Sequence, residues 1–576
     1  MSSTTHPSLA VGRRLPNAFD LAALLCVFAV VIGVVRVAPA TFKPIAAAGA
    51  LAVDLAPSHL PEYALRTTLR MFAALALSLL FTFTYAPLAV RSRRAGFVLI
   101  PLLDVLQSVP ILGFLSFTTA FFMGLFPGSV LGLELAAIFA IFTSQAWNMA
   151  FSFYQSLTTI PRDLEEAARS FHLTAWQRFW RLDVPFAIPG LVWNTMLSMS
   201  GGWFFVVASE AITLGDNTWK LPGIGSYVAE ALAKRDLGAI GWAILAMFGV
   251  ILIYDQVLFR PLVAWSAKFR FEVTAGAVAA DPWLLKLLRR TRVLRLAADG
   301  VSDAVGRLAA LPLGGVTGGA SATPQRRTRM GDAVFFTIVG LVVALAVVRV
   351  VDYITANHIG WADLAEAVGL GCITLLRVVV LIALASLVWV PVGVWIGLRP
   401  AWARRIQVVA QFLAAFPANL LFPIFVVLIV RFHLSADIWL TPLMILGTQW
   451  YILFNVVAGA SAFPGDLQEA AESLHLRGWL WWRRVILPGI FPYYVTGAIT
   501  ASGGSWNASI VAEVATWGHD KLVAHGLGAY IAQATDAGDF PRIVLGVAVM
   551  SGFVIVFNRG VWRPMYAYAT RRLTLS

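Results

Sequence analysis

Two acidic residues at equivalent positions are the side chains of this sequence best placed to do chemistry inside a membrane. Glu210 and Glu513 stand 303 positions apart, each at the end of a long apolar run. A carboxylate at membrane depth costs free energy, so it marks a candidate functional site. Each acid either lines a path for a solute, or accepts from the glycine-rich segment after it, or pairs with Arg70 or Arg377. We favour the structural roles, because two carboxylates on one path would repel an anion.

Small and polar residues precede each of these acids. Small residues open a lumen between helices, while hydroxyl, indole and amide groups can hydrogen-bond a solute. Ordinary helix packing through small residues explains any single one of them about equally well. The residues predicted to line a pathway are Ser200, Trp203, Phe204, Glu210, Gly503, Trp506, Asn507 and Glu513.

A short segment rich in alanine and acidic residues occurs twice. Residues 161–173 read Pro-Arg-Asp-Leu-Glu-Glu-Ala-Ala-Arg-Ser-Phe-His-Leu, and residues 464–476 read Pro-Gly-Asp-Leu-Gln-Glu-Ala-Ala-Glu-Ser-Leu-His-Leu. We expect a short helix in each, capped by Asp163 or Asp466, with alanines that leave a smooth face for another protein. A chance tripeptide is a poor alternative, because the match recurs at one fixed offset. The residues predicted to face a partner are Glu166, Ala167, Ala168, His172, Glu469, Ala470, Ala471 and His475.

The composition requires a membrane around these elements. Of 576 residues, 59% are hydrophobic and only 13% are charged, and the mean hydropathy is +0.78. A soluble chain of this length would need more polar surface. The net charge of +13 lies in short clusters between apolar runs, which favours cytoplasmic loops beside anionic lipid over nucleic-acid binding. The two cysteines form no metal-ligand pattern, and no cofactor is predicted.

The apolar runs predict an all-α membrane protein with about twelve transmembrane helices in two parallel six-helix repeats. Spans need about 20 apolar residues, and Pro110 and Pro417 are expected to kink the third and ninth. The repeat keeps one offset from Trp147 and Trp450 to Asp236 and Asp539. A pathway is expected between the halves. The predicted runs are 19–36, 69–90, 97–124, 130–157, 190–213, 240–261, 332–351, 372–396, 405–431, 437–460, 491–513 and 541–560.

Arginine clusters between the runs predict that both termini are cytoplasmic, because positive residues collect in cytoplasmic loops. Arg13-Arg14, an apolar stretch and Ala38-Pro39-Ala40 also resemble a cleavable secretory signal. Residues 332–351 occupy the same place in the second half without a cleavage site, so we expect an uncleaved span.

The chain divides into three predicted regions. The first repeat covers 1–265, with a cytoplasmic loop at 161–190, and the second covers 329–576, with a loop at 464–493. Residues 266–328, rich in Arg, Ala and Gly, predict a cytoplasmic linker, with an amphipathic stretch around Trp283 to Leu296 as a helix on the membrane surface.

Glu166-Ala167-Ala168 with Pro185, and Glu469-Ala470-Ala471 with Pro488, resemble the "EAA" loop of type I ABC importer permeases. The flanking residues resemble the nitrate/sulfonate/taurine branch, and the resemblance covers nearly the whole chain twice. It differs from the family where His172 and His475 replace a glycine. A non-glycine residue is expected to avoid the left-handed conformation there.

The resemblance implies a fused permease of the bacterial inner membrane. The two loops would be coupling helices that dock on two copies of a cytoplasmic ABC ATPase, and an extracytoplasmic solute-binding protein would deliver the solute. A small oxyanion such as nitrate, a sulfonate, taurine or bicarbonate is the implied substrate class.

The sequence has no Gly-x-x-x-x-Gly-Lys-Ser/Thr loop and no catalytic constellation, so ATP hydrolysis is expected from a separate subunit and no enzymatic activity from this chain. A secondary transporter with parallel repeats is the alternative. That class usually carries intramembrane charges for ion coupling, which are few here. The predicted partners are the ATPase, the solute-binding protein and membrane lipid, without nucleic acid.

Overall fold

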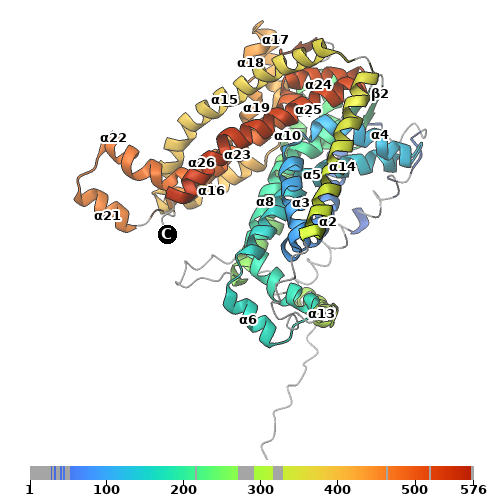
Figure 1. The fold of residues 1–576 in the computed structure, drawn as a ribbon. Coiled ribbons are helices and arrows are strands. Elements are labelled where there is room, and N and C mark those ends of the chain that lie inside the picture. The colour runs from blue at the N-terminus through green and yellow to red at the C-terminus, as the bar shows by residue number, and fades with distance from the viewer. Residues whose placement is uncertain are drawn as a thin grey trace, which may run out of the picture. The chain divides into compact units, whose positions relative to one another are not determined.

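The computed structural model describes residues 52–214, 217–269, 291–314, 329–357, 359–461, 465–517 and 520–572, with scattered positions among 28–45 and single residues at 284 and 463. The first predicted run, 19–36, and most of the predicted linker therefore lie largely outside the described residues. Helices make up nearly all of the described chain (Figure 1), which confirms the all-α class.

Long helices of the first half correspond to predicted runs two to six. Membrane-length apolar helices include α2, α5 and α10, which match three of these runs directly. Two short helices, α6 and α7, occupy the loop at 161–190. The helices are α2 (Leu60–Arg91), α3 (Arg93–Ser108), α4 (Leu115–Leu125), α5 (Val130–Thr158), α6 (Arg162–Ser170), α7 (Ala175–Arg178), α8 (Val184–Ser209), α9 (Ile224–Ala233), α10 (Leu237–Tyr254) and α11 (Arg260–Ser266).

The second half repeats this order after the linker helix α13 (Arg292–Ala310). Eight helices of the described chain are long and apolar enough to cross a membrane, or ten if each of two bent pairs is one span. The other helices are α14 (Arg329–Ala356), α15 (Trp361–Gly397), α16 (Pro400–Ala415), α17 (Phe422–Arg431), α18 (Ala436–Trp439), α19 (Leu443–Leu446), α20 (Gln449–Ser461), α21 (Gly465–Ser473), α22 (Gly478–Trp481), α23 (Leu487–Ala512), α24 (Leu527–Asp536), α25 (Phe540–Phe557) and α26 (Arg563–Arg572).

The third and ninth predicted spans are broken at their prolines, so the prediction of a mere kink is wrong. Helix α3 ends at Ser108 and Val109 is extended, with φ −75° and ψ 128°. Helix α16 ends at Ala415 and Phe416 is extended, with φ −70° and ψ 126°. The ring of a following proline disfavours the helical conformation for the residue before it, which favours both breaks, although Pro101 and Pro391 lie inside continuous helices.

Two β-hairpins, which the sequence did not predict, follow the acids at 210 and 513. Strands β1 (Ala211–Leu214) and β2 (Asn217–Lys220) pair antiparallel, with Ala211 opposite Lys220. Strands β3 (Val514–Trp517) and β4 (Asp520–Val523) repeat this, with Val514 opposite Val523. Each hairpin returns the chain to its acid, because Leu221 N–H donates to Glu210 O and Ala524 N–H donates to Glu513 O, both at 2.8 Å.

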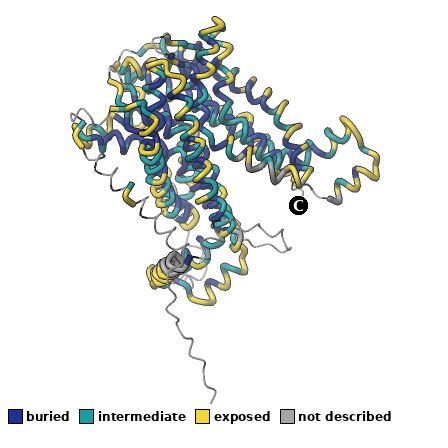
Figure 2. Tube along the Cα trace, turned by 180° about the vertical axis from the view of Figure 1, so that it is seen from behind, coloured by how far each residue is buried: buried dark blue, intermediate teal, exposed yellow. Residues whose placement is uncertain are grey.

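The chain forms two compact units, each described here by itself. The larger contains 39–159, 190–255 and 322–576, and the smaller contains 1–38, 160–189 and 256–321. In the larger unit α2 packs along α5, while α20 packs against α15 and α23. Figure 2 shows buried and exposed positions mixed along the helices. Large apolar side chains such as Leu341 and Leu387 are exposed, as expected of helices that face lipid.

In the smaller unit, the end of the linker helix α13 is hydrogen-bonded to the first loop. Trp176 Nε1–H donates to Leu308 O at 2.7 Å, and Gln177 Nε2–H donates to Ala310 O at 2.9 Å. The predicted amphipathic stretch from Trp283 to Leu296 overlaps this helix only at its start. Its placement on a membrane surface remains a prediction.

Candidate functional site

The carboxylate of Glu210 is held in a buried network inside the first half. It accepts from Arg70 Nη1 at 2.7 Å, from Thr67 Oγ1 at 2.6 Å and from Gly225 N–H at 2.6 Å. Arg70 also binds Glu134 through two bonds of 2.6 and 2.8 Å. Glu210 has no exposed surface and Arg70 is only 3% exposed. The two structural roles considered for Glu210, an arginine partner and backbone amides, therefore occur together.

Glu513 sits in a matching but more open network in the second half. Its carboxylate accepts from Arg377 Nη1 at 3.1 Å, from Thr374 Oγ1 at 3.0 Å and from Ala529 N–H at 3.0 Å. Arg377 also pairs with Asp437 at 3.1 Å, whose side chain is 44% exposed. Of the two carboxylates that pair with Arg377, Glu513 is therefore buried and Asp437 is partly exposed.

Glycines let each carboxylate reach the start of the helix that follows the hairpin. A Cβ atom added to Gly223 would lie 2.3 Å from the Glu210 carboxylate, and one added to Gly526 would lie 2.3 Å from that of Glu513. Both acids therefore stand at the amino end of a ten-residue helix, α9 or α24. The exposed N–H groups and the helix dipole favour a negative charge there.

A lysine joins each hairpin to the helix after it. Lys220 Nζ lies 2.6 Å from Glu230, and Lys521 Nζ lies 2.7 Å from Asp536. The hydrogen bond from Lys220, reinforced by Lys234, lowers the pKa of Glu230 below its ordinary value.

Within the larger unit, the two halves meet around a small cavity of about 80 Å³. Sites for drug-sized ligands usually have roughly 300–1,000 Å³, so this cavity is too small to hold such a ligand. Its wall contains hydroxyl and aromatic groups and no charged side chain. The lining residues are Ser200, Gly201, Phe204, Phe205, Ala414, Phe416, Ala418, Leu443, Met444, Gly447, Thr448, Tyr451, Gly504 and Ala508.

Two hydrogen bonds join the halves beside this cavity, and both involve a broken span. Ile111 N–H, just after the first break, donates to Asn507 Oδ1 at 2.6 Å. Asn419 Nδ2–H, just after the second break, donates to Phe204 O at 3.2 Å. Phe204 and Asn507 occupy equivalent repeat positions, so each half anchors the broken span of the other.

The structure places the predicted pathway residues differently: some lie at the cavity or at the junction of the halves, and the others lie elsewhere. Ser200 and Phe204 line the cavity, and Asn507 lies at the junction of the halves. Trp203 and Trp506 are 0% and 1% exposed, with indole N–H groups that have no partner in the described chain. Glu210 and Glu513 are enclosed by their own halves, and Gly503 is not among the lining residues.

Two cavity residues, Tyr451 and Thr448, were missed from sequence. Tyr451 lines the wall, and a Cβ added to Gly201 would lie 3.1 Å from its hydroxyl oxygen. Thr448 Oγ1 lies 3.1 Å from Ser505 Oγ. Thr448 directly precedes α20 and Tyr451 lies in its first turn, within a predicted span. The only sequence signal for their position was the pattern of small residues on the facing helices, which indicated that helices approach closely there.

The two predicted loops display their acids on short helices. Helix α6 begins after Pro161, which makes no side-chain cap. The expectation that Asp163 caps it is therefore wrong, because Asp163 lies inside the first turn. Glu166 and Ala167 are exposed while Ala168 is 5% exposed.

The second loop displays its predicted residues in the same way. Glu469 and Ala470 are exposed and Ala471 is 4% exposed. Each helix therefore offers its glutamate and first alanine while the second alanine packs inward.

Both histidines adopt the left-handed conformation, contrary to expectation. His172 has φ 49° and His475 has φ 52°. Each is the residue after the helix cap in a Schellman motif: Leu173 N–H donates to Ala168 O at 3.2 Å, and Leu476 N–H donates to Ala471 O at 3.0 Å. Histidine is among the residues enriched in this region, so the turn that glycine would make is kept.

The fold and the repeated sequence define an integral membrane protein built from two repeats. A family model described as "Binding-protein-dependent transport system inner membrane component" matches residues 78–260 and 389–561. Because these matches cover more than half of the chain, the protein belongs to this family of multi-pass inner-membrane transport components.

Curated relatives carry related names at low identity. The chain is 25% identical over 31% of its length to a bicarbonate transport system permease protein, CmpB, of Synechocystis. It is 27% identical over 26% of its length to a nitrate import permease protein, NrtB, of Leptolyngbya laminosa. A glycine betaine/carnitine transport permease protein, GbuB, of Listeria monocytogenes is 29% identical over 27% of the chain. The matches span 61%, 53% and 50% of these three relatives.

Proposed function

We propose that this chain forms the solute pathway of an ATP-driven importer, with its two halves serving as the two permease domains and both termini cytoplasmic. The observation that carries the proposal is the small cavity between the halves, flanked by the reciprocal hydrogen bonds of Ile111 with Asn507 and of Asn419 with Phe204. A passage closed by such contacts opens when the halves move apart, as alternating access requires.

The driving step in this proposal is ATP hydrolysis by two copies of a separate ATPase. Glu166 and Glu469 would contact these subunits from α6 and α21, with an extracytoplasmic protein delivering the solute. The family membership and the matched exposure of the two helices support this arrangement. The secondary-transporter alternative is less attractive, because Glu210 and Glu513 are already ion-paired with Arg70 and Arg377 inside their own halves.

The proposed substrate is a small oxyanion, on the strength of the bicarbonate and nitrate permeases among the relatives. A quaternary ammonium solute of the betaine type is the second candidate. Phe204, Phe205, Phe416 and Tyr451 line the cavity, and aromatic faces attract such cations.

Uptake into proteoliposomes containing the chain, its ATPase and its binding protein tests the pathway and the substrate together. We expect uptake of labelled bicarbonate or nitrate to be lost in Ala508→Phe, which fills the cavity, and kept in Ala569→Phe, at a buried alanine that does not line it. Each variant is used only if its thermal unfolding matches wild type. Uptake of glycine betaine alone would favour the second candidate, and unchanged uptake in folded Ala508→Phe would refute the pathway.

A further inference from the structure

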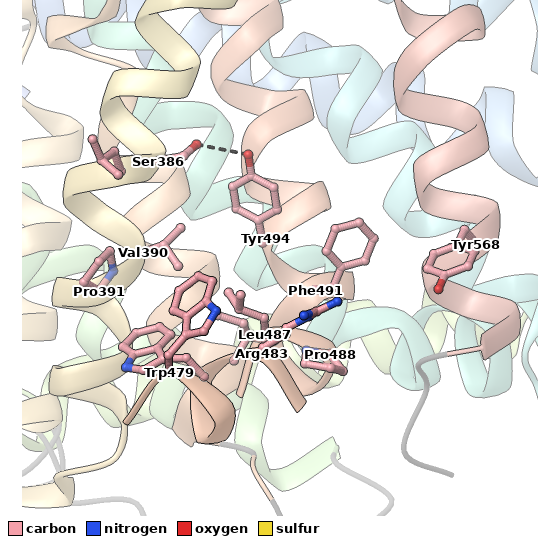
Figure 3. Close-up of a pocket in the computed structure, with 13 residues that line it drawn as sticks. Ser386, Val390, Pro391, Trp479, Arg483, Leu487, Pro488, Phe491, Tyr494 and Tyr568 are labelled. Carbon is pink, nitrogen blue, oxygen red and sulfur yellow. Dashed lines mark hydrogen bonds between the residues drawn. The ribbon is translucent and has the colours of Figure 1, made fainter. Parts of the chain in front are cut away.

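A second and much larger cavity lies in the second half, away from the passage. It has a volume of about 790 Å³ and is bounded by α15, α22, α23 and α26 (Figure 3). Ser386 and Val390 come from α15, Trp479 from α22 and Tyr568 from α26. Nothing in the transport scheme above uses this space.

The inner end of the cavity is apolar and its polar groups are satisfied. Ser386 Oγ–H donates to Ile382 O at 2.7 Å, and its oxygen lies 3.0 Å from the Tyr494 hydroxyl, the dashed contact in Figure 3. Leu387 also lines the cavity, and Val390 and Pro391 continue its apolar wall from Ser386 towards Trp479 (Figure 3). A ligand that reached this end would meet hydrocarbon surface and no unpaired donor.

The mouth of the cavity has a different character. Arg483 is exposed at it, beside Trp479 and Trp482, and no acidic residue is among the lining side chains. Arg483 has no carboxylate partner in the described part of the chain. Tryptophan and arginine together are typical of the level of lipid headgroups.

The depth of the cavity fits the inner leaflet. Ser386 precedes the end of α15 at Gly397 by eleven residues, which is about 16 Å along a helix. With the proposed orientation that end is cytoplasmic, so the cavity runs from the headgroup level about halfway into a hydrocarbon core of roughly 30 Å. An acyl chain has the length and chemistry to fill it.

We propose that this cavity binds one anionic phospholipid of the inner leaflet, with the phosphate at Arg483 and an acyl chain along Leu487, Val390 and Leu387. The first repeat does not keep several of the residues that line this site. Trp482, Arg483 and Tyr494 are replaced in the first repeat by Phe179, Trp180 and Leu191. In the first repeat the rings of Phe179 and Trp180 pack edge to face, with their centroids 5.1 Å apart.

Native mass spectrometry of the purified chain, titrated with phosphatidylglycerol or phosphatidylcholine, tests the proposal. One arginine near the membrane surface contributes roughly 1 kcal/mol to anionic-lipid binding, so phosphatidylglycerol should bind about fivefold more tightly. Arg483→Gln should remove that preference. Arg484→Gln, the neighbouring exposed arginine that does not line the cavity, should keep it.

Two further arms identify the ligand. Val390→Trp, which fills the apolar part of the cavity between Ser386 and Trp479, should weaken binding of both lipids, whereas glycerol 3-phosphate without acyl chains should displace neither. An unchanged preference in Arg483→Gln overturns the proposal, as does lipid binding that Val390→Trp leaves intact. Displacement by glycerol 3-phosphate would show a site for a free phosphate group and would refute the lipid.

Discussion

The loops at 161–190 and 464–493 share a helix and a turn, but among the described residues only the first loop is held by ion pairs and by a hydrogen bond to another helix. In the first loop Arg178 lies 2.7 Å from Glu165 and 3.3 Å from Asp183, and Trp176 is bonded to the linker helix. The corresponding residues of the second loop are Trp481, Gln468, Ile486 and Trp479, and Trp479 is 73% exposed. Duplication has thus kept the displayed helix while the supporting contacts diverged.

The networks around Glu210 and Glu513 also differ, and again the first half has the more enclosed contacts. Arg70 is enclosed with two buried carboxylates, whereas one partner of Arg377 is partly exposed. The first half is the more tightly cross-linked of the two, so equivalent substitutions should have unequal effects.

The largest expected difference is between the two arginines. Arg70→Met leaves Glu134 and Glu210 buried without their cation, which should destabilise the protein by about 3–5 kcal/mol. Arg377→Met should cost less, because it leaves one buried carboxylate, Glu513, instead of two, and because the partly exposed Asp437 keeps His525 as a partner. Thermal unfolding in one lipid or detergent measures both. Equal losses would contradict the asymmetry.

The glycines beside the acids should instead behave alike. Gly223→Ala and Gly526→Ala each push a methyl group into a buried carboxylate, and we expect each to cost about 1–3 kcal/mol through strain and overpacking. Gly249→Ala and Gly552→Ala, at helix positions with open space around the added Cβ, are the controls and should be neutral or slightly stabilising. If Gly526→Ala left the stability unchanged, the Glu513 carboxylate would have room to move away from the added methyl group, which contradicts the close contact seen at Gly526.

The hydrogen bond from Trp176 to the linker helix should have a smaller effect that is confined to the first loop. Trp176→Phe removes the indole donor to Leu308 O, at a cost of about 1 kcal/mol. Hydrogen exchange over residues 161–178 should quicken accordingly. Trp479→Phe is the matched control, and exchange over 464–481 should not change. Identical responses of the two loops would refute a stabilising role for this hydrogen bond.

The smallest effect concerns the ion pair of Glu230 with Lys220. Because the folded-state pKa of Glu230 is lowered, its contribution is present above its ordinary pKa, about 4.3, and is lost as the pH falls below it. For this partly exposed pair we expect at most about 1 kcal/mol. The stability difference between wild type and Glu230→Gln should therefore shrink between pH 6 and pH 3.5. A difference independent of pH would exclude the charge as its cause.

Periodicity and repetition predicted the helices and the two loops because these depend on local apolar patterns and on a fixed offset. The breaks at Pro110 and Pro417 depended on whether neighbouring helices rescue the freed backbone, which one chain's pattern does not reveal. The hairpins are four-residue strands beside glycines, too short for a periodic signal. His172 and His475 were misjudged because the Schellman hydrogen bonds outweigh the cost of their left-handed backbone. Tyr451 could not be assigned to the cavity, since nothing local indicates which side of a buried helix faces the other half.

Whether both loops transmit ATP hydrolysis is tested most directly by co-purifying the chain with the ATPase encoded nearest to it and measuring hydrolysis in lipid. The comparison is wild type against Glu166→Arg with Glu469→Arg, with Asp303→Arg on the linker helix as a control for surface charge. We predict that wild type and Asp303→Arg retain the ATPase and stimulate it, while the double variant folds but loses it. If the ATPase never associates with wild type, or if its hydrolysis is the same with the double variant, coupling through these loops is contradicted.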